Sequence, residues 1–184
     1  MPSPWELLSA CSRRDIEEVR RLLQDPQTDI EVINYQEEFG EKQTPLYLAC
    51  ERGYTEIVEL LLSDQRVDVN KATGVKQTPL YRACEKGHTE IVRLLLKDER
   101  VDVNKGGWTK ATPLYVACYD NYIEIVKLLL NDERVDVNQE DIQGWAPFYI
   151  ACEKGFLEIV LMFSETPRGF FSFSNTSNKF NLDK

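Results

Sequence analysis

The sequence repeats itself every 34 residues, and this period limits the possible folds more than any other feature. The string Thr-Pro-Leu-Tyr begins at residues 44, 78 and 112, and a variant, Ala-Pro-Phe-Tyr, begins at residue 146. A second string, Glu-Ile-Val, begins at residues 56, 90, 124 and 158. Self-similarity at a fixed period of this size is typical of repeat proteins, in which each unit packs against its neighbours.

Each repeat contains the signals of two helices and a turn. Thr44 can cap a helix, and Pro45 suits the first helical position, where no N–H partner is needed. Gly53 is expected to end this helix in a left-handed conformation. A second helix is expected from about Thr55 to Leu62, followed by an extended turn. One such unit cannot bury its own apolar face, whereas a stack of units can.

Five units are predicted, and they define an all-α solenoid of helix-turn-helix units with short extended turns between them. The first unit keeps the two-helix pattern but lacks Thr-Pro, and its link to the second unit is longer. The predicted repeat domain covers residues 1–164, with units at about 5–38, 39–72, 73–106, 107–140 and 141–164, and a Phe-rich tail covers residues 165–184.

The repeated unit closely resembles the ankyrin repeat over residues 5–164. The resemblance rests on Thr-Pro-Leu-Tyr, on Gly-x-x-Glu-Ile-Val and on Val-Asp-Val-Asn, which recurs from residues 67, 101 and 135. The tetratricopeptide repeat has the same period, but its Trp-Leu-Gly-Tyr pattern is absent. The resemblance implies a non-catalytic protein-protein interaction module, a scaffold or adaptor. Such a module binds its partner in the groove formed by the turn tips and the first helices.

The chain departs from the ankyrin pattern in ways that resemble the long arrays of some protists. Tyr replaces the family's His after Thr-Pro-Leu, at residues 47, 81, 115 and 149. The family's His ties neighbouring turns by hydrogen bonds, so these ties must be replaced or lost. An Asp-x-Arg triplet, at 64–66, 98–100 and 132–134, replaces the family's Gly after the second helix. The repeated Arg could cap that helix instead.

Charge narrows the class of partner. The formal net charge is −9, which disfavours nucleic acid and anionic lipid, because both attract clustered Lys and Arg. A partner attracted by charge should therefore be basic. We find no signal-peptide pattern and no apolar stretch near the ~18 residues of a membrane span. We therefore expect a cytoplasmic protein, without membrane association and monomeric.

Residues capable of catalysis or metal binding are not grouped in the sequence. Cys11, Cys50, Cys84, Cys118 and Cys152 occupy the same position of successive units, which favours small buried residues over disulfides. The single His, His88, has no neighbouring pattern of metal ligands. We predict no enzyme activity, no metal and no cofactor. One alternative is that the repeats are the regulatory part of a larger enzyme or effector.

The candidate partner site lies in the fourth and fifth units. Alignment of the units places seven residues in the groove there: Trp108, Tyr119, Asp120, Ile142, Trp145, Glu153 and Lys154. Trp and Tyr are enriched at binding hot spots. In the second and third units the groove positions carry a mixed polar set, including Glu51, Arg52 and Val75.

Two other interpretations of these aromatic residues remain open. Trp108 and Trp145 could brace neighbouring turns without meeting a partner. Alternatively, Trp108, Tyr119 and Trp145 could form a cage for a methylated Lys, which requires the three rings to converge on one pocket.

The last unit lacks the polar outer face expected of a terminal repeat. Leu161 takes the position that Glu59, Arg93 and Lys127 occupy in the preceding units. We expect either that the Phe-rich tail folds over this unit or that the array continues in a longer chain.

Overall fold

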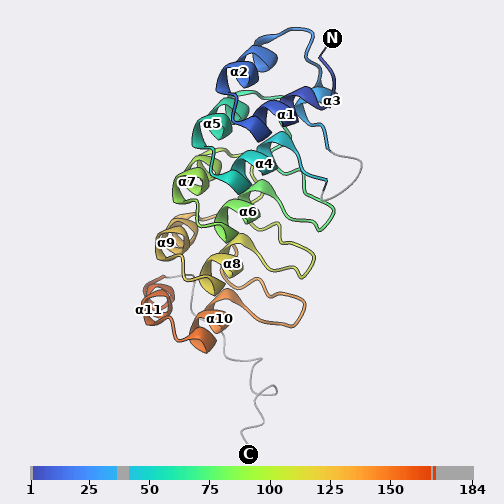
Figure 1. The fold of residues 1–184 in the computed structure, drawn as a ribbon. Helices are drawn as coiled ribbons and strands as arrows, with labels where there is room; N and C mark the ends of the chain where they lie inside the picture. The colour runs from blue at the N-terminus through green and yellow to red at the C-terminus, as the bar shows by residue number, and fades with distance from the viewer. Residues whose placement is uncertain (1, 37–41, 167, 169–184) are drawn as a thin grey trace, which may run out of the picture.

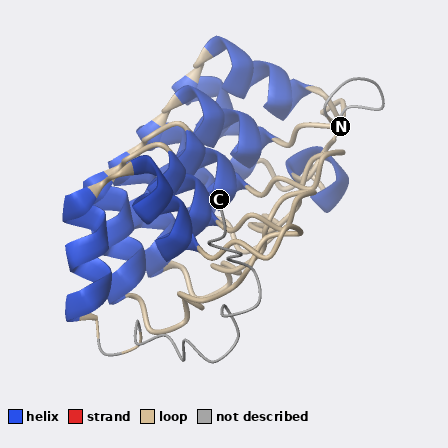
Figure 2. Ribbon diagram, turned by 90° about the horizontal axis from the view of Figure 1, so that it is seen from below, coloured by secondary structure: helices blue, strands red, loops and turns tan. Residues whose placement is uncertain are grey.

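The chain forms an elongated stack of helix pairs in a computed structural model (Figure 1). The structure describes residues 2–36, 42–166 and 168. The first helices of the units form one column: α1 (Glu6–Arg13), α4 (Pro45–Arg52), α6 (Pro79–Glu85), α8 (Pro113–Tyr119) and α10 (Pro147–Lys154). The second helices form another: α2 (Ile16–Gln24), α5 (Thr55–Ser63), α7 (Thr89–Lys97), α9 (Ile123–Asn131) and α11 (Leu157–Glu165). The turns between units project to one side of both columns, and no strand occurs in the described ranges (Figure 2). The predicted all-α solenoid of five helix pairs is confirmed.

The Thr-Pro motif starts the first helices as expected. Thr44 Oγ1 accepts a hydrogen bond of 3.2 Å from the backbone N–H of Tyr47, which the helix would otherwise leave without a partner. Thr78 and Thr112 make the same bond at 3.1 Å. Gly53 ends α4 with φ 72°, in the left-handed region that favours glycine. The sequence therefore fixes both ends of the helix.

The core runs between the two columns through every unit. The second helix α5 buries Ile57, Val58 and Leu61 completely. The equivalent residues of α7 and α9 are also buried, and the valines of each Val-Asp-Val-Asn string are at most 5% exposed. Because each unit contributes the same apolar positions, the stack buries one continuous core.

The longer link after the first unit contains a short helix that the sequence analysis did not predict. This helix, α3 (Ile30–Ile33), is capped by Asp29, whose carboxylate accepts hydrogen bonds of 3.0 Å from the N–H groups of Glu31 and Val32. Val32 and Ile33 are 3% and 1% exposed. Val32 and Ile33 therefore belong to the core, like the valines before Asn70 and Asn104 in later units.

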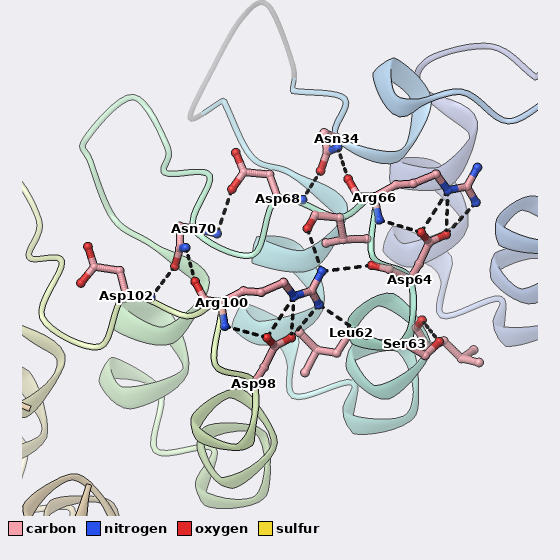
Figure 3. A network of polar contacts seen from close by, with 12 residues as sticks. Asn34, Leu62, Ser63, Asp64, Arg66, Asp68, Asn70, Asp98, Arg100 and Asp102 are labelled. Carbon is pink, nitrogen blue, oxygen red and sulfur yellow. Dashed lines mark hydrogen bonds and ion pairs between the residues drawn. The ribbon is translucent and has the colours of Figure 1, made fainter. Parts of the chain in front are cut away.

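The repeated Arg caps a helix, but in the preceding unit and not in its own (Figure 3). Arg100 donates to the carbonyl oxygen of Leu62, near the end of α5, at 3.0 Å, while Asp98 holds its guanidinium at 2.6 Å. Arg66 and Arg134 reach back in the same way, to Leu23 O at 2.9 Å and Leu96 O at 2.7 Å. The expectation that Arg replaces the glycine cap was right in kind and wrong about which helix receives it.

At the same junctions, an Asn of each unit forms hydrogen bonds with the backbone of the following unit (Figure 3). Asn70 Nδ2 donates to Arg100 O at 2.7 Å, and its Oδ1 accepts from the N–H of Asp102 at 2.8 Å. Asn34 and Asn104 make equivalent pairs of bonds to the units that follow them. Each of these junctions therefore has one Arg reaching back and one Asn reaching forward.

At one junction between units, a Tyr makes the hydrogen bond between neighbouring turns that the His makes in other family members. The hydroxyl of Tyr47 donates to Gln77 Oε1 at 3.0 Å, which joins the second unit to the turn of the third. The phenol is long enough to span the gap between adjacent turns.

The end of the array extends beyond the boundary predicted at residue 164. Helix α11 runs to Glu165, and Arg168 donates to the carbonyl oxygen of Leu130, as Arg134 does one unit earlier. The side chains of Leu157 and Leu161 are 74% and 60% exposed, so the apolar outer face of this unit is present as expected. Most of the Phe-rich tail, residues 169–184, lies outside the described residues, so its role stays a prediction.

Candidate functional site

The site is built on the turn loops, which we define as residues 71–77, 105–111 and 139–145 of successive units. Their tips are joined by backbone hydrogen bonds. The N–H of Trp108 donates to Val75 O at 3.1 Å, and the N–H of Ile142 donates to Thr109 O at 2.8 Å. Lys76 and Lys110 adopt φ near 60° to make these tight turns, and Gly144 does so in the last loop. The three tips therefore form one connected edge of the groove.

Apolar side chains project from this edge into solvent. Trp108 is 73% exposed, Ile142 is 61% exposed and Val75 is 43% exposed. We call these three residues the apolar tip row. The sequence analysis placed Val75 in the mixed polar set of the third unit, and the structure instead brings it next to Trp108. The signal was present in the alignment, because Val75 directly follows Gly74, the equivalent of Trp108 and Ile142.

The floor of the groove contributes Tyr119 and Lys154. Tyr119 is the last residue of α8 and is 47% exposed, and Lys154 is the last residue of α10. The Lys154 Nζ lies 3.9 Å from the centre of the Tyr119 ring, a cation–π contact between neighbouring units. Two predicted residues are therefore in direct contact.

The Asp120 carboxylate, next to Tyr119 in sequence, occupies an environment that disfavours its charged form. Burial raises the pKa of Asp120, and the neighbouring Glu85 raises it further, while Lys154 and Lys86 oppose the shift. Burial raises the pKa of Tyr115 to about 12, with further increases from the charges of Asp141 and Glu153. Burial is therefore the main cause of both shifts, and charges of both signs lie close to Asp120.

Trp145 is engaged within its own unit. Its ring stacks on Tyr149, with ring centres 4.0 Å apart and planes 16° from parallel. Its Nε1–H donates to Gln143 Oε1 at 3.1 Å. These contacts lie within the fifth unit, so they show Trp145 supporting its own loop and not bracing a neighbouring turn, whereas Trp108 on the preceding loop is exposed.

The groove charges of the second and third units are paired with one another, which the sequence analysis did not predict. Arg82 of α6 forms ion pairs with Glu51 of α4 and with Glu85. Arg52 donates to the carbonyl oxygen of Ser12 at 2.6 Å. These residues therefore hold first helices together and are not a freely solvated surface. In the fourth and fifth units the position of Arg82 carries Val116 and Ile150, so this polar set ends where the apolar groove residues begin.

The cysteines and the histidine form no reactive constellation in the part of the chain that the structure describes. Four cysteines are buried and Cys152, in the last unit, is exposed, which corrects the expectation that all five are buried. Burial raises the pKa of Cys11 to about 12. The Nε2 of His88 lies 3.1 Å from the carbonyl oxygen of Glu51, a contact between two units. No group of three metal-ligating side chains occurs among the described residues.

Two surface hollows lie away from the candidate residues. One is formed by α9 and α11 and lined in part by Leu130, Leu161 and Met162. The other lies beside α3 and is lined in part by Tyr35 and Lys71. No described helix has the length and apolar character needed to cross a membrane.

Comparison with known families supports the resemblance stated from the motifs. The family model described as ankyrin repeats (3 copies) matches residues 7–107 and again residues 102–169. The comparison with curated proteins found no match. Ankyrin repeats are generally protein-protein interaction modules. The two matched segments cover most of the sequence, and the chain therefore belongs to the ankyrin repeat family.

Proposed function

We propose that the chain is a non-catalytic scaffold or adaptor that binds a partner protein with the turn-loop tips and first helices of its third to fifth units. The observation that carries this proposal is the apolar tip row. Trp108, Ile142 and Val75 leave large apolar surfaces in water on three connected tips. Such surfaces usually mark a contact with another molecule, and aromatic residues often dominate the binding energy.

Rigidity of the site supports this function. The tips are joined by backbone hydrogen bonds, and the units beneath them are joined by the Arg and Asn bonds. A surface that is already ordered loses little conformational entropy when a partner binds. Recognition would then depend on the fit between the partner and a preformed edge.

The other predicted residues surround the tip row in the manner of an interface rim. In this proposal the exposed Tyr119 extends the apolar surface toward the groove floor, and the exposed Asp120, Glu153 and Lys154 supply the charges of the rim. Interfaces commonly have an apolar centre and a polar rim. Trp145, stacked on Tyr149, would support the last loop from within. The net charge of −9 favours a basic protein as the partner over nucleic acid or an anionic membrane.

A methyl-lysine cage receives less support. Tyr149 stacks on the Trp145 ring, and Lys154, which a partner's cation could displace, lies over the Tyr119 ring. A cage needs several ring faces open to one cation. The observed contacts direct these faces to other residues of the chain.

Binding measurements on matched variants test the proposal. A partner captured by affinity pull-down would be titrated by calorimetry against the wild type, Trp108→Ala, Tyr119→Ala and Leu157→Ala. We expect each of the first two substitutions to weaken binding by ~2 kcal/mol or more. Leu157 is the control, because it is 74% exposed and lies on α11, in the other helix column. Unchanged melting temperatures would confirm that the variants are folded. Equal affinities of Trp108→Ala and wild type, with a loss in Leu157→Ala, would move the site to the second helices.

A further inference from the structure

In the second and third units, a cation on the groove floor is held by several groups at once. The guanidinium of Arg82 lies 5.9 Å from the centre of the Tyr47 ring and forms ion pairs with Glu51 and Glu85. Its side chain and those of the two glutamates are at most 27% exposed. One arginine therefore satisfies an aromatic face and two carboxylates from adjacent first helices.

In the fourth and fifth units, the same surface loses the arginine and redistributes its aromatic and acidic groups. Val116 and Ile150 stand at the positions equivalent to Arg82. Tyr119 and Glu153 take the positions of Glu51 and Glu85, and Asp120 takes the position of Arg52 and Lys86. Among the described residues, Asp120 and Glu153 are held by no side-chain hydrogen bond or ion pair. Lys154 and Lys86 act on Asp120 only at longer range, so these carboxylates are available for direct pairing with a further cation.

Lys154 occupies the open aromatic face only loosely. Its ammonium lies 3.9 Å from the centre of the Tyr119 ring, but it forms no ion pair among the described residues, unlike Arg82. Lys154 is exposed and carries a long flexible stem. An exposed cation–π contact contributes only ~0.5–1 kcal/mol. An incoming cation that also paired with Asp120 or Glu153 would be held more strongly than Lys154.

We infer that the partner inserts a Lys or Arg side chain over Tyr119, displaces Lys154 and pairs with Asp120 or Glu153, while an adjacent apolar residue contacts Trp108 and Ile142. This inference rests on the proposed function, because it assigns the partner's chemistry at the same site. The recognised segment is then a peptide with one basic side chain next to an apolar one. The carboxylates of Asp120 and Glu153 supply charge complementarity, and the tip row supplies the apolar contact.

Selection from a random linear peptide library displayed on phage, with the folded full chain as bait, tests this inference. We expect the enriched peptides to share a Lys or Arg next to a large apolar residue. The affinity of one enriched peptide would then be measured by fluorescence anisotropy for the wild type, Lys154→Met, Tyr119→Leu and Asp120→Asn. Lys154→Met should tighten binding by about threefold, because it removes the competing cation. Tyr119→Leu should weaken binding by about fivefold, because it keeps an apolar contact but removes the ring.

A neutral peptide analogue provides the matched control. With norleucine in place of the basic residue, the peptide should bind more weakly and should no longer be bound more tightly by Lys154→Met. Enriched peptides that need Trp108 but carry no basic residue would overturn this inference and leave the proposed function standing. Enriched peptides that bind Trp108→Ala as tightly as the wild type would contradict both. A library that yields no binder at all would also count against both.

Discussion

The guanidinium of Arg100 donates a hydrogen bond of 3.0 Å to the carbonyl oxygen of Leu62, which lies one unit earlier in α5. Helix α5 ends at Ser63, and the residue that follows, Asp64, has an extended and not a left-handed backbone, so no glycine cap satisfies the last carbonyl groups. Arg100 takes over this role from the next unit, and Asp98 fixes its orientation at 2.6 Å. The same hydrogen bond therefore caps helix α5 and joins two neighbouring units.

Removing this guanidinium should destabilise the stack. Arg100→Met keeps an apolar stem but loses the bonds to Leu62 and Asp98, so we expect the free energy of unfolding to fall by ~1–3 kcal/mol. Urea denaturation followed by circular dichroism would measure the change. Arg93→Met is the control, because Arg93 is an exposed residue of α7 whose one ion pair among the described residues is with Glu90. This change should cost less than ~1 kcal/mol. Equal losses in the two variants would show that the cross-unit bond contributes nothing.

The Asp-x-Arg pairs should make the free energy of unfolding depend on pH. Hydrogen bonds from Arg66, Arg100 and Arg134 lower the pKa values of Asp64, Asp98 and Asp132 in the folded chain. In the unfolded chain these carboxyls return to about 3.9. Because the folded values are depressed, the stabilisation is present above pH ~4 and is lost as the pH falls through the folded values.

The Asp98→Asn variant checks the assignment of this pH dependence. It should be less stable than the wild type at neutral pH, because the neutral amide holds Arg100 less strongly. It should also lose less stability than the wild type between pH ~4 and pH ~2, because one proton-binding site has been removed. Thermal melts across this range would give both quantities. Parallel pH profiles for the two proteins would assign the acid sensitivity to other carboxyls.

Two glycines with the same backbone conformation should differ in their tolerance of a methyl group. Gly87 and Gly155 both have φ +73°, so either Gly→Ala change carries a left-handed strain of ~1–2 kcal/mol. A Cβ at Gly87 would lie 2.8 Å from the ring of Tyr122, whereas at Gly155 nothing lies within 4 Å. We expect Gly87→Ala to cost at least ~1 kcal/mol more than Gly155→Ala. Chemical denaturation of the pair measures this difference, and equal costs would show that the Tyr122 ring moves aside freely.

Substitution of a cysteine should also cost more stability in the middle of the stack than at its end. Cys84 is buried and Cys152 is exposed. Cys84→Ser places a hydroxyl in an apolar contact and should cost ~1–3 kcal/mol, whereas Cys152→Ser should be nearly neutral. In the folded protein a thiol reagent should label one cysteine rapidly, and reductant should leave the melting temperature unchanged. Rapid labelling of several cysteines, or a fall in melting temperature with reductant, would contradict this arrangement.

Most of the fold follows from local signals in the sequence. Thr44 and Pro45 mark a helix start, and Gly53 marks its end, because each acts through the backbone of its own segment. The helix that Arg100 caps could not be predicted in this way. Its partner, Leu62, lies 38 residues away, and only the relative position of two stacked units decides which carbonyl the guanidinium reaches. Helix α3 was missed because four residues are too few to show a helical period.

For the candidate site too, the sequence predicted positions within a unit but not the contacts between units. The alignment of the units correctly marked Trp108, Tyr119 and Ile142 as exposed groove positions, because every unit repeats the same backbone. The contact between Lys154 and Tyr119 joins two units and could not be predicted from either one. Likewise, Glu51 looked like a solvated charge until its pairing with Arg82 on the next first helix was known.

The bonds at the junctions end on main-chain atoms of the neighbouring unit. Arg100 binds the carbonyl oxygen of Leu62, and Asn70 binds the carbonyl oxygen of Arg100 and the N–H of Asp102. Main-chain atoms are the same whatever side chains the neighbour carries, so these particular bonds do not depend on the neighbour's sequence. A duplicated unit with this Arg and this Asn could therefore make the same main-chain bonds on entering the array. The tip position, occupied in turn by Gly74, Trp108 and Ile142, is then free to diversify while the joints below it stay fixed.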